Sequence, residues 1–110
     1  MELAKGKCEP CKGGIPPLKG KGLKISVDKL GDKSWKVIDE HHIEKEFKFP
    51  DFKTALEFVN KVGKISEKQG HHPEIVLNWG SVVVRFWTHK INGLHENDFI
   101  MAAKVNKIFG

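Results

Sequence analysis

The clearest pattern of apolar and polar positions lies in residues 52–69 and has the period of a helix. Apolar or small residues recur there three or four positions apart, and lysines and glutamates occupy the opposite face. They are Phe52, Ala55, Leu56, Val59, Val62 and Gly63. Asp51 precedes the pattern as a candidate N-cap, and Gly70 follows it as a helix stop. The pattern predicts an amphipathic helix that ends at about Gln69.

Residues 35–49 alternate between apolar and polar side chains, as a pair of strands does. Trp35 and Val37 begin one strand. In the second strand Ile43, Lys45, Phe47 and Phe49 alternate with Glu44, Glu46 and Lys48. His41 and His42 fall between the two segments at a polar connection, which we interpret as an exposed turn. A β-hairpin is therefore the expected structure.

Residues 73–88 predict a second pair of strands. Segments 73–79 and 81–88 are joined around the turn sequence Asn78-Trp79-Gly80. Alternation in the later strand divides its side chains between two faces. One face would carry Val82, Val84 and Phe86, and the other Val83, Arg85, Trp87 and His89.

The two ends of the chain complete the fold prediction. Residues 1–22 are rich in Lys, Gly and Pro, so we expect an irregular leader before a single domain of residues 23–110. Residues 23–31 predict a short helix ended by Gly31, and a last helix follows the loop 92–94. The order α-β-β-α-β-β-α predicts an α+β fold with a four-stranded antiparallel sheet and three helices packed on one face.

Composition indicates one globular domain. The chain has 110 residues, of which 39% are hydrophobic and 30% are charged. No apolar run approaches the roughly 18 residues of a membrane-spanning helix. The first residues also lack the apolar stretch of a secretory signal. We expect a cytoplasmic protein without membrane contact.

The net charge of +5 raises the question of nucleic-acid binding. However, the 19 basic residues are spread along the chain and interleaved with 14 acidic ones. Arg85 is the only arginine, although arginine is the preferred reader of guanine edges. Nucleic acid is therefore not the expected partner, and an anionic small molecule or partner fits the charge equally well.

The two cysteines, Cys8 and Cys11, form a C-x-x-C spacing in the leader. A structural zinc site needs four ligands, and no second pair of this kind occurs in the sequence. We interpret the pair as surface thiols in a loop. A redox role, or a metal role with a histidine from elsewhere in the chain, remains an alternative.

Histidines and carboxylates concentrate between residues 67 and 98. Glu67 and His71 are four positions apart near the end of the predicted central helix, and His72 follows directly. His89 lies just past a strand, and Asp98 lies in the first turn of the last helix. Imidazole, with an ordinary pKa of roughly 6.5, exchanges protons near neutrality. The cluster therefore indicates either proton-transfer chemistry or a metal site.

Each member of the cluster also has a simpler interpretation. Adjacent histidines on an extended backbone point to opposite sides, which argues against a metal site that contains both His71 and His72. The same pair at a helix C-terminus favours the helix dipole when charged. With His95 as the N-cap, Asp98 falls at the third helical position, where its carboxylate closes a capping box. We favour that structural role for Asp98.

The spacing of the cluster resembles the signature of pterin-4a-carbinolamine dehydratases. The matching run is Glu67-x3-His71-His72-Pro73-x5-Trp79-x9-His89-x8-Asp98. Further similar positions are Trp35, Phe47-x-Phe49-x-Asp51-Phe52, Thr88-His89 and Gly93-Leu94, and the leader Cys8-x2-Cys11-x-Gly13-Gly14-Ile15-Pro16-Pro17-Leu18 is similar to that of microbial members. The chain departs from these proteins at His95, where they tend to have Ser or Thr.

The resemblance implies a reaction and the residues that perform it. The reaction is dehydration of 4a-hydroxytetrahydropterin, such as 4a-hydroxytetrahydrobiopterin, to quinonoid dihydropterin by histidine acid–base catalysis, without a metal or organic cofactor. The implied catalytic residues are His71, His72 and His89, with His71 and His89 as the direct acid–base groups and His72 orienting the ring. The implied substrate-binding residues are Gly70, His71, His72, Trp87, Thr88, His89 and Lys90, supported by Glu67 and Asp98.

The resemblance also implies partners and a setting. Members of the family form homodimers or homotetramers, and the reaction recycles tetrahydropterin for an aromatic amino-acid hydroxylase. Two alternatives remain open at this point. One is a regulatory module that serves as dimerisation partner of a transcription regulator, and the other is a pterin role linked to molybdopterin metabolism.

Overall fold

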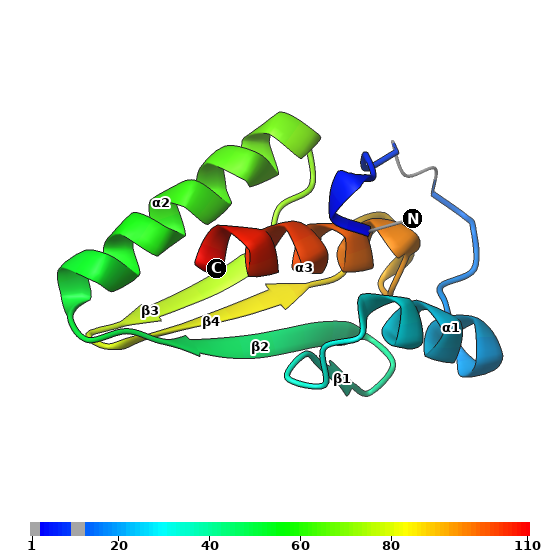
Figure 1. Ribbon diagram of the computed structural model, residues 1–110. Coiled ribbons are helices and arrows are strands. Elements are labelled where there is room, and N and C mark those ends of the chain that lie inside the picture. Colours follow the sequence, from blue (N-terminus) through cyan, green and yellow to red (C-terminus); the bar gives the residue numbers. More distant parts are fainter. Residues whose placement is uncertain (1–2, 10–12) are drawn as a thin grey trace.

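A computed structural model of the chain describes residues 3–9 and 13–110. Its helices and strands follow the predicted order α-β-β-α-β-β-α (Figure 1). They are α1 (Gly20–Leu30), β1 (Lys36–Ile38), β2 (His42–Lys48), α2 (Phe52–Gln69), β3 (Glu74–Asn78), β4 (Ser81–Phe86) and α3 (Glu96–Phe109), with two short 3₁₀-helices, η1 (Leu3–Lys5) and η2 (His89–Ile91).

The four strands form one sheet in the order β1-β2-β4-β3, and each neighbouring pair is antiparallel. Figure 1 shows α2 and α3 above the sheet, with α1 beside its right-hand end. α1 packs against α3, and α3 also contacts α2 and β4. The predicted α+β fold is therefore confirmed.

The core lies between the sheet and the helices. Val82, Val84 and Phe86 of β4 are fully buried, as their alternation predicts, and they meet buried side chains of α2 and α3. Each fully buried side chain of this kind stabilises the fold by about 1.5–3 kcal/mol. At one margin of the core, the indole N–H of Trp35 donates to Asn106 Oδ1 at 3.0 Å.

The ends of α2 are set by the residues that the sequence indicates. Oδ1 of Asp51 accepts a hydrogen bond from the backbone N–H of Thr54 at 2.8 Å. Gly70 adopts φ +66°, a left-handed conformation that suits glycine, and so ends the helix. Helix α1 begins at Gly20, earlier than the predicted start at residue 23. It ends at Gly31, as predicted, and this glycine has φ +68°.

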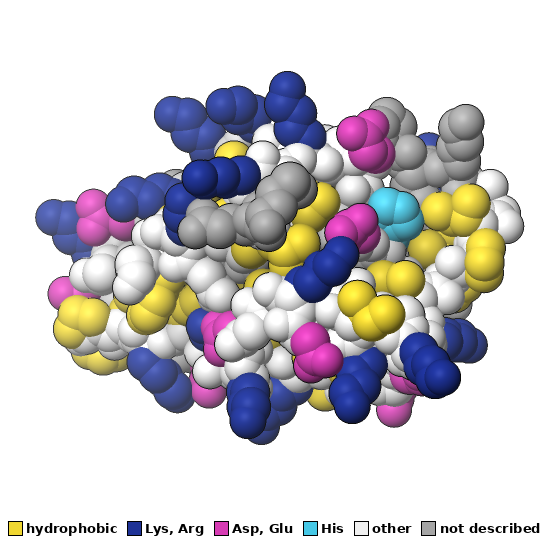
Figure 2. All heavy atoms as spheres, turned by 45° about the vertical axis from the view of Figure 1, so that its right-hand side comes forward, with side chains coloured by type: hydrophobic (Ala, Val, Ile, Leu, Met, Phe, Trp, Pro, Cys, Tyr) yellow, Lys and Arg dark blue, Asp and Glu magenta, His cyan; other side chains and the backbone are white. Residues whose placement is uncertain are grey.

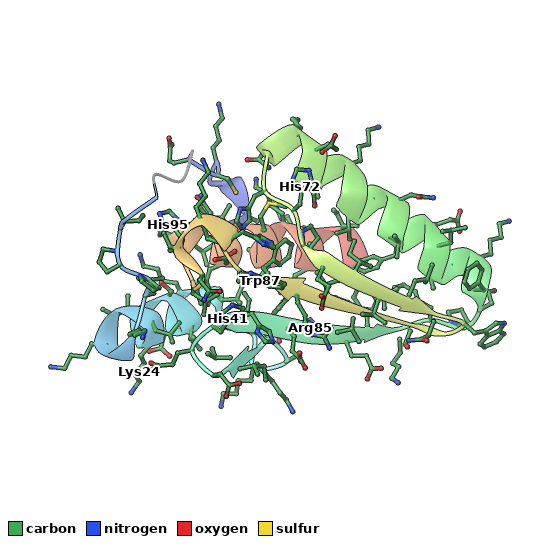
Figure 3. The ribbon with its side chains drawn as sticks, turned by 180° about the vertical axis from the view of Figure 1, so that it is seen from behind. Lys24, His41, His72, Arg85, Trp87 and His95 are labelled. Carbon is green, nitrogen blue, oxygen red and sulfur yellow. The ribbon has the colours of Figure 1, made fainter. Side chains whose placement is uncertain are left out.

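The interpretation of His41 and His42 as an exposed turn is wrong for the position of His42 and for the exposure of both side chains. Asp39, Glu40 and His41 form the turn, with Asp39 and Glu40 at φ +54°, whereas His42 begins β2 and pairs with Ile38. Both histidines are half-buried because their rings lie against Trp87, with centroid distances of 5.3 and 5.9 Å. Figure 3 shows His41 beside Trp87.

The described part of the leader packs against the domain. η1 lies on α3, where Nζ of Lys104 donates to the carbonyl of Ala4 at 2.8 Å. The backbone N–H of Leu18 donates to the carbonyl of Leu94 at 2.8 Å. These contacts place η1 along α3 and Leu18 beside the loop that precedes α3.

The surface charge is mixed, as the interleaved basic and acidic residues of the sequence predict. On the face shown in Figure 2, lysine and arginine side chains are spread around the outline and interspersed with aspartate and glutamate. Across the residues that the structure describes, no helix has both the length and the apolar composition needed to cross a membrane.

Candidate active site

A cavity of about 420 Å³ opens where the C-terminus of α2, the end of β4, the N-terminus of α3 and the leader meet. Six of the seven residues expected to bind substrate line it, namely Gly70, His71, His72, Thr88, His89 and Lys90. The other lining residues are Cys8, Glu9, Gln69 and Asn97. The cavity therefore joins the predicted histidine cluster to residues that sequence reasoning did not include.

His71 is held from three directions at the cavity. Its backbone N–H donates to the carbonyl of Ser66 at 3.2 Å, and its ring stacks on Phe86 at a centroid distance of 6.1 Å and an interplanar angle of 12°. Nε2 lies 2.5 Å from Oδ1 of Asp98. The side chain of His71 is only 11% exposed. One imidazole is thus fixed in position and orientation beside the cavity.

Asp98 is fully buried, and its carboxylate accepts hydrogen bonds from two other residues besides His71. The Thr88 hydroxyl and the backbone N–H of His95 each donate to Oδ2 at 2.9 Å. An ionised carboxylate only accepts, so Nε2 of His71 carries the hydrogen of their shared bond. In neutral His71 the lone pair of Nδ1 is therefore the one that can accept a proton.

The predicted capping box of α3 is confirmed. The carboxylate of Asp98 accepts a hydrogen bond from the backbone N–H of His95. Nδ1 of His95 in turn accepts from the backbone N–H of Asn97 at 3.0 Å. Histidine thus serves as an N-cap where serine or threonine is more usual. Asp98 has two roles, because the carboxylate that caps α3 also orients His71.

Glu67 pairs with His72, not with His71 as the four-residue spacing suggests. Oε2 of Glu67 and Nε2 of His72 are hydrogen-bonded, and both side chains are largely exposed. The spacing rule fails because Gly70 ends α2, so His71 and His72 no longer follow the helical repeat. His71 therefore turns to buried Asp98, and His72 remains at the rim near the end of α2 (Figure 3).

His89 lines the cavity, whereas Trp87, whose ring contacts that of His89, does not. His89 is exposed, begins η2 and lines the cavity. Trp87 does not line the cavity, because strand alternation turns its indole to the sheet face away from the helices. Its ring instead lies 4.6 Å from that of His89 and against His41 and His42.

Thr88 and Lys90 complete this side of the cavity. Thr88 is buried, its hydroxyl binds Asp98, and its backbone N–H donates to the carbonyl of Gly93 at 2.8 Å. This bond closes the loop that carries His89 and Lys90. The base of this loop is thus fixed, and the loop residues His89 and Lys90 line the cavity.

The leader contributes Cys8 and Glu9 to the cavity. Gln69 Oε1 accepts from the backbone N–H of Cys8 at 3.1 Å. Asn97 accepts from the N–H of Glu9 at 3.0 Å and donates to its carbonyl at 2.7 Å. The similarity of the leader to microbial relatives was the only sequence signal for this wall, and it did not indicate where the leader packs.

Cys8 is a half-buried thiol rather than a surface one. Burial raises its pKa from 9.0 to about 11, Lys104 lowers it and the Asp98 carboxylate raises it. A thiol with this pKa stays protonated near neutrality, and only the thiolate is strongly nucleophilic. Cys11 lies outside the described residues, so the C-x-x-C pair as a whole stays a prediction.

Among residues 3–9 and 13–110, no group of three or more His, Cys, Asp or Glu side chains is arranged to hold a metal ion. His71 and His72 engage different carboxylates, as their adjacent positions suggest.

The chain is similar to known proteins over nearly its whole length. A family model described as Pterin 4 alpha carbinolamine dehydratase matches residues 16–108. A protein of Rubrobacter xylanophilus, provisionally named pterin-4-alpha-carbinolamine dehydratase, is 50% identical over 107 residues, which cover 97% of this chain and 98% of the relative. One of Alkaliphilus metalliredigens with the same provisional name is 50% identical over 105 residues, covering 96% and 94%.

Two solved structures share the fold. One is described as a transcriptional coactivator/pterin dehydratase from Brucella melitensis; it has a TM-score of 0.78 and 34% identity and covers 86% of this chain and 99% of that chain. The other is a pterin dehydratase-like protein described as a RuBisCO assembly factor in the alpha-carboxysome, with a TM-score of 0.61, 23% identity and coverage of 70% and 90%. At that identity the second likeness concerns the fold alone.

Proposed function

Because the chain belongs to the pterin-4a-carbinolamine dehydratase family, we propose that it converts a 4a-hydroxytetrahydropterin into quinonoid dihydropterin and water. The observation that carries this proposal is the cavity, which joins an oriented imidazole, His71, to two further histidines on its rim. Its volume of about 420 Å³ falls within the roughly 300–1,000 Å³ of small-molecule sites.

The reaction needs two proton transfers near one carbon. The bond from C4a to the hydroxyl oxygen breaks, the oxygen takes up a proton and leaves as water, and the pterin ring loses a proton. In our proposal His71 and His89 carry these two protons, each step contributing about 10²–10⁴-fold. Asp98 holds His71 in the tautomer with a free Nδ1, and the base of the η2 loop positions His89.

His72 has a different part in the proposal. Its Nε2 is engaged by Glu67 at the exposed rim, so it is better placed to hold the ring than to exchange protons. Thr88 and Lys90 bind the pterin from the η2 side. The substrate is a tetrahydropterin such as the biopterin form, and the reaction uses no metal or organic cofactor.

The setting proposed for this activity is cytoplasmic tetrahydropterin recycling for an aromatic amino-acid hydroxylase. We also propose a homo-oligomer, either a dimer or a tetramer. The strand β3 lies at one edge of the sheet, with Val76 39% exposed on it, and an unpaired edge invites pairing.

A regulatory module is the second candidate. The Brucella relative, 34% identical, is described as a transcriptional coactivator as well as a pterin dehydratase. This alternative predicts that the isolated chain leaves the carbinolamine unchanged and only alters the assembly of a partner protein. A single activity measurement on the purified chain therefore separates the two.

The test is dehydration of enzymatically generated 4a-hydroxytetrahydropterin, followed by ultraviolet absorbance in the presence of a chelator. We expect rapid conversion by the wild type and a loss of at least about 100-fold in His71→Ala and His89→Ala. His42→Ala is the matched control, because this histidine does not line the cavity, and it should stay within about twofold. A folded wild type no faster than the spontaneous reaction would favour the regulatory module.

A further inference from the structure

The leader forms a wall of the cavity that the proposed proton transfers do not use. Cys8 and Glu9 line this wall, whereas the catalytic histidines come from the end of α2 and from η2. Two side-chain amides hold the wall in place. The side-chain oxygen of Gln69 accepts a hydrogen bond from the backbone N–H of Cys8. The side-chain amide of Asn97 accepts from the backbone N–H of Glu9 and donates to its carbonyl.

Asn97 holds the backbone of Glu9 with two hydrogen bonds. Its side chain is buried, and its amide pairs with Glu9 in both directions, at 3.0 Å through its oxygen and 2.7 Å through its nitrogen. This arrangement imitates the pairing of two backbone segments. Asn97 also precedes Asp98, so the backbone of Glu9 is tied directly to the helix turn that orients His71.

Glu9 supplies the one carboxylate among the described lining residues of the cavity. Asp98 lies behind His71 and Glu67 is paired with His72, and neither lines the cavity. The other charged or titratable lining groups are Cys8, His71, His72, His89 and Lys90. Glu9 is therefore the one described lining residue that can offer a carboxylate to a ligand with paired N–H donors.

A pterin offers such a pair. Its pyrimidine ring presents N3–H and the 2-amino group side by side, and a carboxylate accepts two parallel hydrogen bonds from donors in that arrangement. Resting on the proposed function, we propose that Glu9 binds this edge and selects 2-amino pteridines. C2 and C4a lie opposite each other in the ring, so a pterin held at C2 by the leader directs C4a towards the histidines.

The test measures binding of two ligands without turnover. Wild type, Glu9→Gln and Glu96→Gln are titrated with 7,8-dihydropterin and with 7,8-dihydrolumazine, whose 2-oxo group replaces the 2-amino donor. We expect the wild type to bind the pterin about tenfold more tightly and Glu9→Gln to lose that preference. Glu96→Gln, an exposed neighbour on α3 that does not line the cavity, removes the same charge and should keep the preference.

Kinetics provide an independent readout. Glu9 does not reach the reacting atoms in this arrangement, so Glu9→Gln should raise KM about tenfold and leave kcat within about twofold. Asn97→Ala, which releases the backbone of Glu9, should shift KM in the same direction. A Glu9→Gln variant that keeps the ligand preference would overturn the inference and leave the dehydratase proposal standing. A folded wild type that binds neither ligand would overturn both.

Discussion

The imidazole of His71 lies 2.5 Å from the carboxylate of Asp98, which is completely excluded from solvent. Asp98 also accepts from Thr88 and from the N-cap residue of α3, so its position is determined by the helix itself. The orientation of the candidate acid–base group is therefore coupled to the start of α3. A change at Asp98 should affect catalysis and stability together, and the two effects can be separated.

Asp98→Asn tests the orientation of His71. The amide can still accept from the N-cap N–H, but it presents a donor to Nε2 of His71 and so favours the wrong tautomer. We expect kcat to fall about 10²–10⁴-fold while the free energy of unfolding falls by about 1–3 kcal/mol. Dehydration kinetics and urea denaturation measure the two quantities.

Thr88→Val is the matched comparison for that variant. It removes one hydrogen bond to Asp98 but leaves the carboxylate and its contact with His71. Its loss of kcat should be much smaller than that of Asp98→Asn. Equal losses in the two variants would mean that packing, and not the tautomer of His71, limits the rate.

Glu67→Gln should have little effect on stability. Its partner His72 is exposed, and pairs of exposed charged groups contribute about 0–1 kcal/mol. We expect the urea midpoint to stay near that of the wild type, and any functional change to appear in KM. A loss of several kcal/mol would show that the rim pair supports the fold.

Cys8 should resist alkylation at neutral pH. Burial raises its pKa from 9.0 to about 11, and two pKa units correspond to about a hundredfold less thiolate at pH 8. In a Cys11→Ser background, the rate with iodoacetamide should keep rising through pH 10. Mass spectrometry measures this rate, and the urea-unfolded chain is the control. A rate that levels off near pH 9 would contradict the raised pKa.

Asp32 should contribute stability that disappears in acid. Although burial opposes it, the hydrogen bond from Lys45, at 2.6 Å, lowers the pKa of Asp32 in the folded chain below its ordinary 3.8. A carboxyl group with a lowered folded pKa stabilises the fold above its unfolded pKa, and this contribution is lost as the pH falls below it.

The difference in unfolding free energy between wild type and Asp32→Asn should therefore shrink as the pH falls below about 4. Urea denaturation from pH 7 to pH 2.5 measures it, with Asp28→Asn, an exposed aspartate of α1, as the control. A difference that is constant across this range would show that the pKa of Asp32 is the same in the folded and unfolded chains.

The predictable parts of the molecule are those that short-range patterns determine. Helix α2 follows from its apolar stripe, from Asp51 and from Gly70, and the burial of Val82, Val84 and Phe86 follows from strand alternation. The capping box could also be predicted, since its residues lie three positions apart.

The unpredicted parts depend on contacts between distant segments. Asn97 binds Glu9 across 88 positions, and Gln69 binds Cys8 across 61, and no local periodicity records either contact. The partner of His71 could not be read from spacing, because the left-handed Gly70 rotates the chain away from the helical repeat. His41 and His42 are half-buried because their rings lie against that of Trp87, which directly follows β4.

Trp87 should affect His89 and not the substrate directly. Its indole lies 4.6 Å from the His89 ring and does not line the cavity. Trp87→Ala frees one face of the His89 ring, so we expect kcat to fall about tenfold with KM within about twofold. Trp87→Phe keeps an aromatic surface and should recover most of the rate. If the indole stacked on the pterin instead, Trp87→Ala would raise KM strongly, and steady-state dehydration kinetics distinguish these outcomes.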